Sequence, residues 1–184
     1  HMHRIRHNVI QKALIMGDDE EGALGRTQCV HAFGHDLQRV DIETGIGFIP
    51  DVGGTYLLSR APGELGTHIA LTTARLSAGD AIAAGFADHF IPSENIETFI
   101  AALASSSVAD AVAQYAEPAP VSELLAQQSW IDAAYSADDV STIVERLRAS
   151  GIPEAEKAAE QILGKSPIAL SVTLRSLRHA KEAA

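Results

Sequence analysis

The chain has 184 residues, of which 46% are apolar and 21% charged, and its formal net charge is −10. This length and composition are typical of one globular domain, or of one domain with a helical appendage, and they allow a sizeable core. The acidic balance argues against nucleic-acid binding, which depends on clustered lysine and arginine.

Cysteine content and hydropathy bear on location. The single cysteine, Cys29, cannot form an internal disulfide, which favours a reducing, cytoplasmic setting. No apolar run approaches the roughly 20 residues that cross a bilayer, so we expect no membrane association. The acidic chain can still bind an anionic ligand through a local basic patch. The candidate cations are Arg60, Arg75, Lys165, Arg175 and Arg178.

The first 92 residues divide into two stretches. Residues 1–42 follow no clear pattern: the apolar run at 9–17 fits a strand or a helix equally, and the acidic run at 18–22 is typical of a solvated turn. Glycine and proline then become frequent over residues 43–92. Several glycines in one short segment indicate backbone at positive φ, or backbone approached closely by another group.

Two short helices and a strand are expected in the second half of that segment. Apolar spacing predicts a helix over 63–73. A second helix is predicted over 77–86, because Ser77 and Asp80 have the spacing of a capping box and a glycine stands near its end. Residues 87–92 then predict a short strand that stops at a proline.

The remainder, residues 93–184, is predicted to be helical throughout. Apolar residues at helical spacing indicate a helix from about 138 to 150, which a glycine and a proline end. Ser166 followed by Pro167 marks the start of the last helix. That helix is expected to bury one leucine face, made of Leu170, Leu174 and Leu177.

Two carboxylates in the glycine-rich stretch are candidates for chemistry. Glu43 and Asp51 are separated by glycines and a proline, a spacing that suits a loop aiming both side chains at one pocket. Paired carboxylates are useful there because their environments can push their pKa values apart, which leaves one as base and the other as acid or orienting group. Gly53 and Gly54 indicate a loop that runs into a helix, whose backbone N–H groups can hold an oxyanion.

Other interpretations remain open at this point. Acidic residues in a glycine-rich loop are most often solvated turn residues, and spacing alone does not decide between the two. His31 and His35 have a spacing compatible with zinc on a helix, but no fixed ligand set accompanies them, so we expect no metal site. The sequence contains no G-x-S-x-G, which leaves serine nucleophile chemistry unsupported.

Two segments resemble a known superfamily. ETGIGFIPDVGG at 43–54 is similar to the P-E-x-x-x-G-x-x-P-x-x-G-G loop of the crotonase (enoyl-CoA hydratase/isomerase) superfamily, with Ile42 where proline is usual. ARLSAGDAIAAGFADHFIP at 74–92 resembles the segment that follows in that superfamily. The resemblance implies an α/β protein with a crotonase spiral core over residues 1–92, incomplete on its N-terminal side, followed by a helical C-terminal region over 93–184.

Asp51 indicates which members of the superfamily the chain resembles most. Enoyl-CoA hydratases usually carry glycine at this position, whereas the 3-hydroxyisobutyryl-CoA hydrolases carry P-D-V-G-G, as this chain does. The helical stretches 129–147 and 165–178 also resemble those hydrolases. The resemblance therefore implies hydrolysis of a short β-hydroxyacyl-CoA thioester in valine breakdown, with acyl-CoA as substrate and no cofactor. It implies Glu43 and Asp51 as catalytic residues and four glycines as substrate-binding residues: Gly17, Gly47, Gly53 and Gly54.

Two alternatives accompany this expectation. A hydratase or isomerase normally needs a second glutamate just after a glycine triplet; Glu20 or Glu21 lies near that place, but here Met16–Gly17 precedes an acidic run instead. A truncated, non-catalytic crotonase-fold protein is the other alternative, since the N-terminal half of the superfamily is not recognisable. A homo-oligomer is possible in either case.

Overall fold

The computed structural model describes residues 49–50 and 53–183, and over these residues the chain is helical. The predictions for Gly17, Glu43, Gly47 and Asp51 lie outside the described residues. The helices are α2 (Gly54–Ser59), α3 (Leu65–Thr72), α4 (Ala78–Ala83), the 3₁₀ turn η2 (Ser93–Asn95), α5 (Ile96–Ala102), α6 (Val108–Tyr115), α7 (Glu123–Ala126), α8 (Gln128–Tyr135), α9 (Val140–Ala149), α10 (Pro153–Leu163) and α11 (Pro167–Glu182).

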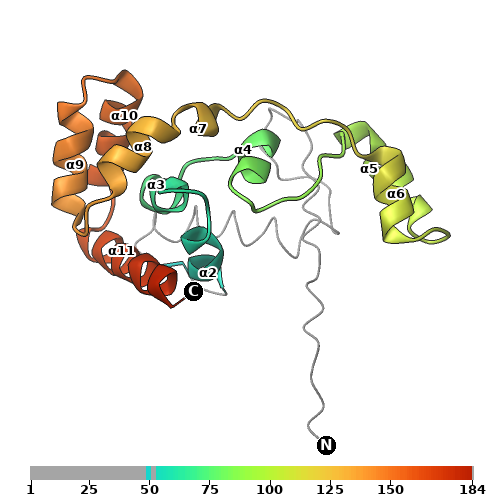
Figure 1. Cartoon of the computed structure of the whole chain (residues 1–184), viewed down its shortest axis with the longest axis horizontal. Helices are drawn as coiled ribbons and strands as arrows, with labels where there is room; N and C mark the ends of the chain where they lie inside the picture. The colour runs from blue at the N-terminus through green and yellow to red at the C-terminus, as the bar shows by residue number, and fades with distance from the viewer. Residues whose placement is uncertain (1–48, 51–52, 184) are drawn as a thin grey trace, which may run out of the picture.

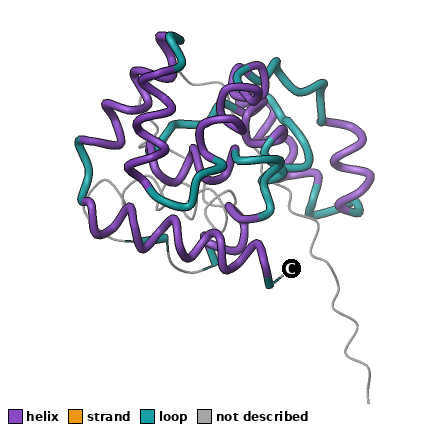
Figure 2. The backbone as a smooth tube through the Cα atoms, turned by 60° about the vertical axis from the view of Figure 1, so that its left-hand side comes forward, coloured by secondary structure: helices purple, strands orange, loops and turns teal. Residues whose placement is uncertain are grey.

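The described helices form two groups. In Figure 1, α2, α3 and α8 to α11 gather at one end and the pair α5–α6 lies at the other, with α4 and α7 between them. Figure 2 shows the same helices from another side, linked by loops that cross between the groups. Each group has its own buried cluster: a large one under α2, α3 and α8 to α11, and a small one around Phe99, which meets Tyr115 edge to face at 6.1 Å.

Local capping signals set several helix starts, as the sequence predicts. Ser77 accepts the Asp80 N–H and the Asp80 carboxylate accepts the Ser77 N–H, which completes the predicted capping box of α4. Ser166 caps α11, and Pro167 follows at the first helical position, where a missing N–H costs nothing. The same side-chain cap opens three more helices, at Ser107, Ser122 and Asp139.

The strand predicted over residues 87–92 is wrong. That segment makes a single antiparallel bridge, in which the Glu117 N–H donates to the Phe90 carbonyl at 2.9 Å. On one side of this bridge the next pair of the ladder would join Pro92, which has no N–H to donate, to Tyr115, the last residue of α6. The pairing therefore cannot extend in that direction.

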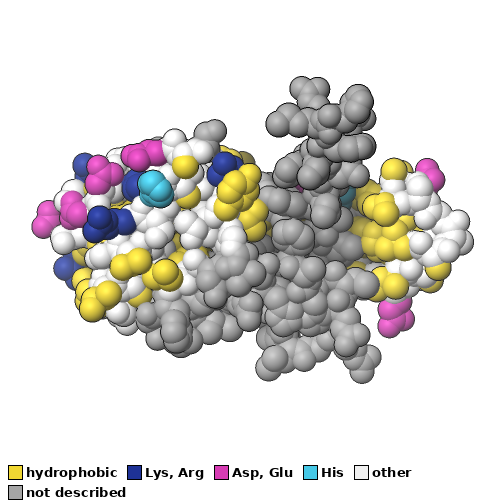
Figure 3. Space-filling view, turned by 90° about the horizontal axis from the view of Figure 1, so that it is seen from below, with side chains coloured by type: hydrophobic (Ala, Val, Ile, Leu, Met, Phe, Trp, Pro, Cys, Tyr) yellow, Lys and Arg dark blue, Asp and Glu magenta, His cyan; other side chains and the backbone are white. Residues whose placement is uncertain are grey.

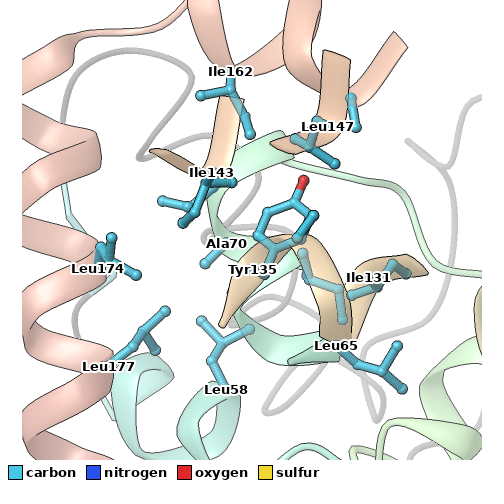
Figure 4. Packing of buried hydrophobic residues seen from close by; sticks show 14 of the residues in the cluster. Leu58, Leu65, Ala70, Ile131, Tyr135, Ile143, Leu147, Ile162, Leu174 and Leu177 are labelled. Carbon is cyan, nitrogen blue, oxygen red and sulfur yellow. The ribbon is translucent and has the colours of Figure 1, made fainter. Parts of the chain in front are cut away.

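The large core draws on both sides of the predicted boundary at residue 92. Aliphatic side chains of α2, α3 and α8 to α11 converge around the ring of Tyr135 (Figure 4), which is fully buried. The three leucines predicted to face inward on α11 are at most 3% exposed, which confirms that prediction. The division into domains at 92 stays a prediction. The labelled side chains are Leu58, Leu65, Ala70, Ile131, Tyr135, Ile143, Leu147, Ile162, Leu174 and Leu177.

A glycine allows α2 and α3 to touch. A Cβ built on Gly66 would lie 1.8 Å from the backbone carbonyl oxygen of Leu58. Because that neighbour is backbone and not a mobile side chain, the two helices can approach this closely only with glycine at position 66. The contact joins the helix after the candidate loop directly to the core.

One histidine is buried beside the core. Nδ1 of His68 and the hydroxyl of Tyr135 share a hydrogen bond of 2.9 Å, and the edge of Trp130 meets the imidazole at 5.5 Å between ring centroids. Burial disfavours the charged imidazolium and lowers the pKa of His68 to about 4. Burial also raises the pKa of the Tyr135 hydroxyl, so both groups are neutral near pH 7.

His68 makes stability depend on pH. In the unfolded chain the imidazole has its ordinary pKa of 6.5 and in the folded chain about 4, so the unfolded state binds more protons between these values and the free energy of unfolding falls as pH falls through that window. Since a tenfold change in a protonation equilibrium corresponds to about 1.4 kcal/mol, the loss at the acid end is about 3 kcal/mol. Urea denaturation at pH 7.5 and at pH 4.5 measures it.

The contribution of His68 is isolated by comparing variants. His68→Asn keeps a hydrogen-bonding group near Nδ1 but does not titrate, so its unfolding free energy should change less between the two pH values than that of the unmutated protein. His179→Asn, at an exposed position on α11, should keep the full change. Equal pH dependence in His68→Asn and the unmutated protein would show that His68 is not responsible.

Candidate active site

The glycine-rich loop runs into a helix, as the sequence predicts. Gly53 is the N-cap of α2 with φ 89° and ψ 0°, in the left-handed region, and Gly54 is buried at the first helical position. Nothing lies within 4 Å of the place where a Cβ on Gly53 would stand, so the positive φ, and not crowding, favours glycine there. The two predicted substrate-binding glycines that the structure describes therefore lie together at the start of α2.

Thr55 was missed by sequence reasoning. Its hydroxyl donates to the carbonyl oxygen of Pro50 at 3.0 Å, and the bond is partly buried. The Leu57 N–H donates to the Gly53 carbonyl at 3.2 Å. The residue before Asp51 and the residue two after it are thus both bonded to the first turn of α2. A hydroxyl in the first turn of a helix after a Gly-Gly pair was the available signal.

Helix α2 packs against α11 and α3. Leu58, 2% exposed, faces Leu174 and Leu177 of α11 in the core (Figure 4). On its other side the carbonyl of Leu58 lies against Gly66 of α3. A short helix with few hydrogen bonds of its own gains most of its stability from such packing. Gly53 and Gly54, at the start of α2, are therefore attached to the large core.

The predicted basic residues do not all serve a ligand. Arg178 donates to Glu64 at 2.7 Å, to the Ala137 carbonyl at 3.0 Å and also to the Tyr135 carbonyl. Although burial raises it, the pKa of the Glu64 carboxyl is held below its usual value by hydrogen bonds from Thr67 and Arg178. Arg178 therefore ties α11 to α3 and α8, which is a structural role.

The other predicted cations make different contacts. The guanidinium of Arg60 stacks on the exposed ring of Tyr56 at 3.7 Å, and Lys165 donates to the Thr73 hydroxyl at 2.7 Å. Arg75 and Arg175 are exposed. On the face shown in Figure 3, basic and acidic side chains alternate over the end of the molecule that α2, α3 and α8 to α11 form, at the left of the view. A single-sign patch is not visible on that face.

Comparison with known proteins shows the family of the chain. The family described as Enoyl-CoA hydratase/isomerase matches residues 42–184, which include Glu43, Asp51 and every helix from α2 to α11. The chain belongs to the enoyl-CoA hydratase/isomerase family. The recognition based on residues 43–54 and 74–92 is confirmed, and with it a crotonase-like fold. The spiral α/β core and its incompleteness on the N-terminal side stay predictions.

Three similar proteins illustrate the range of this family. A mitochondrial 3-hydroxyisobutyryl-CoA hydrolase of Danio rerio is 41% identical over 147 residues, which are 73% of this chain and 38% of the relative. The crystal structure of a carnitinyl-CoA dehydratase from Mycobacterium thermoresistibile is 54% identical, with a TM-score of 0.75, over 76% of this chain and 41% of that one. An enoyl-CoA hydratase structure from Rhodobacter sphaeroides is 40% identical, with a TM-score of 0.66, over 74% and 39%.

The chain spans about two fifths of the length of these relatives. The names of these relatives include both a hydrolase and hydratase-type enzymes. Among the described residues, none of the helices has the length and hydropathy needed to cross a membrane. The histidine pair His31 and His35 lies outside the described residues.

Proposed function

We propose that the protein hydrolyses a short β-hydroxyacyl-CoA thioester, with 3-hydroxyisobutyryl-CoA as the preferred substrate, as a step of valine breakdown. The observation that carries the proposal is the aspartate at position 51 in Pro-Asp-Val-Gly-Gly, where a hydratase usually has glycine. The name of the Danio rerio relative supports the same reaction. The proposed hydrolysis needs no metal or redox cofactor.

The proposed reaction divides its work between Glu43 and Asp51. Water adds its oxygen to the thioester carbonyl, the carbon–sulfur bond breaks, and the products are the acid and free CoA thiol. One carboxylate activates this water, or itself attacks the carbonyl to form an acyl-enzyme anhydride that water then hydrolyses, and the other carries the proton to the leaving sulfur.

Backbone N–H groups complete the proposed site. A tetrahedral intermediate carries an oxyanion, and oriented N–H donors stabilise the charge that develops there. Gly17, Gly47, Gly53 and Gly54 are the proposed substrate-binding residues. Gly53 and Gly54 are supported by their position: they connect the Asp51 segment to α2, which is anchored in the core. This anchoring favours a fixed backbone next to the reacting group.

A dehydratase or hydratase is the second candidate function. The carnitinyl-CoA dehydratase structure is 54% identical to the chain and the Danio rerio hydrolase 41%, and this difference favours the dehydratase class. The aspartate at position 51 favours the hydrolase, because a hydratase usually has glycine there. A hydratase also needs a second glutamate, and the candidates for it, Glu20 and Glu21, lie in a run that is acidic throughout. A non-catalytic family member is a third possibility, in which acyl-CoA binds without turnover.

Substrate assays separate these candidates. Free thiol should appear with 3-hydroxyisobutyryl-CoA or 3-hydroxypropionyl-CoA, measured with a thiol-reactive dye. Crotonyl-CoA should not be hydrated efficiently, and carnitinyl-CoA should not be dehydrated, as followed by absorbance of the conjugated enoyl thioester. Hydration or dehydration without thiol release would replace the hydrolase assignment by the second candidate. Binding without any turnover would support the third.

Location and assembly also belong to this proposal. We propose a cytoplasmic location on the single cysteine; the Danio rerio relative is named as mitochondrial. We propose a possible homo-oligomer and neither nucleic-acid nor membrane partners. Fractionation and size-exclusion chromatography with light scattering test these points.

A further inference from the structure

A hollow lies beside α9, where the chain turns from α10 into α11. Its volume is about 400 Å³, within the range of about 300–1,000 Å³ that small-molecule pockets occupy. All of its lining residues lie within 140–171, in the part of the chain that the structure describes, at the end of the molecule where Figure 1 draws α9 to α11. The glycines at the start of α2 do not line it.

The base of the hollow is apolar. Val144, Ile162 and Leu170 line it, and these side chains are at most 7% exposed and belong to the large core. Val140 and Leu163 add aliphatic surface, and Leu163 is 54% exposed. Covering such a side chain with another apolar group removes hydrocarbon from water, which is favourable. The base therefore fits the hydrocarbon part of a ligand.

The charged residues of the lining carry a positive balance. Arg148 and Lys165 contribute two cations and Glu145 one anion, which leaves one net positive charge on a chain of net charge −10. Lys165 donates to the Thr73 hydroxyl at 2.7 Å. Arg148 is exposed, and no ion pair among the described residues includes it. The lining therefore favours a ligand with a single negative charge, which Arg148 can meet.

We propose that this hollow binds a small monocarboxylate with an apolar chain, the chemical class of free medium-chain fatty acids. The chain lies on the aliphatic base, and the carboxylate pairs with Arg148, because a guanidinium matches a carboxylate with two parallel N–H···O bonds. A carboxylate carries the one negative charge that the lining balances, whereas a phosphate brings a second charge toward Glu145. The inference goes beyond the proposed hydrolysis and does not depend on it.

Octanoate is the probe for this site. Isothermal titration of the full chain with octanoate should give a dissociation constant of about 1 mM or lower. Octanamide keeps the chain and removes the charge, and butyrate keeps the carboxylate and shortens the chain. Each should bind about 5-fold more weakly or worse, because each lacks one of the two contacts. Free CoA should not displace octanoate.

Two pairs of variants place the ligand in the hollow. Arg148→Gln should weaken octanoate binding about 3- to 10-fold. Arg146→Gln is its control, because that guanidinium bonds to the end of α8 and does not line the hollow. Leu163→Glu should weaken binding about 10-fold, since it sets a carboxylate beside the ligand's own. Ile168→Glu, at a 77% exposed position outside the lining, should keep the unmutated affinity, as should Arg146→Gln.

The outcomes separate this site from other binding. Losses in Arg148→Gln and Leu163→Glu at an unchanged Tm, with amide shifts in NMR spectra confined to residues 140–148 and 162–171, would support the proposal. No octanoate binding by the unmutated chain would overturn it, and so would equal affinities in all four variants. Displacement of octanoate by CoA would also overturn it, because it would assign the ligand to an acyl-CoA site. The absence of thioester hydrolysis would refute the proposed function alone.

Discussion

Asp51→Asn and Glu43→Gln are each expected to lower kcat for thioester hydrolysis by about 10²–10⁴-fold while KM changes little. Both changes keep the size of the side chain and remove its charge, so the loop should still fold. A group that contacts the reacting atoms acts mainly in the transition state, which is why the loss should appear in kcat. Steady-state assays of thiol release with 3-hydroxyisobutyryl-CoA measure it.

The double variant adds a second criterion. Two carboxylates that work as one unit are not additive, so Glu43→Gln combined with Asp51→Asn should be little worse than the poorer single variant. Asp88→Asn is a matched control at an exposed acidic position within the family match and should keep normal turnover. If Asp51→Asn retains at least half of the activity, the solvated-turn interpretation is correct and the hydrolase mechanism is abandoned.

Leu174→Ala is expected to lower the free energy of unfolding by about 2–5 kcal/mol, since it leaves a cavity among well-packed neighbours. Leu174 is 1% exposed and lies in the cluster with Leu58 and Leu177. Urea denaturation followed by far-UV circular dichroism measures the change. The stability of a protein is typically about 5–15 kcal/mol, so the loss is a large share of the total.

Ile168→Ala is the matched control on the same helix. Ile168 is 77% exposed at the start of α11, and its truncation should change the unfolding free energy by no more than about 0.5 kcal/mol. Similar losses for the two variants would contradict the assignment of the inward face. Because Leu174 supports α2, we also expect Leu174→Ala to lower kcat more than Ile168→Ala does.

Local signals in the sequence determined where several helices begin and end. The capping box of Ser77 and Asp80 and the Ser166–Pro167 start each depend on groups within three residues. Gly85 adopts a φ of 76° just after α4, as expected for a glycine that ends a helix. Such features need no distant partner, so the residues that carry them are sufficient to predict them.

The family and the candidate chemistry also came from the sequence. The loop at 43–54 predicted a member of the enoyl-CoA hydratase/isomerase family, and the family match over residues 42–184 confirms that membership. Glu43, Asp51, Gly17 and Gly47 lie outside the described residues, so their roles stay predictions. A motif can indicate these residues because family members share the loop that their chemistry requires.

Only the tertiary structure decided which distant residues meet. Arg178 pairs with Glu64, 114 positions away, and His68 bonds Tyr135 across 67 positions. Neither contact leaves a periodic signal in the sequence. The strand predicted over residues 87–92 also depended on a distant partner. Among the described residues it pairs only at Glu117, and the next position of the ladder would join Pro92, which has no N–H to donate, to the end of α6. Capping depends on neighbours along the chain, whereas ion pairs, buried hydrogen bonds and strand pairing depend on neighbours that folding brings together.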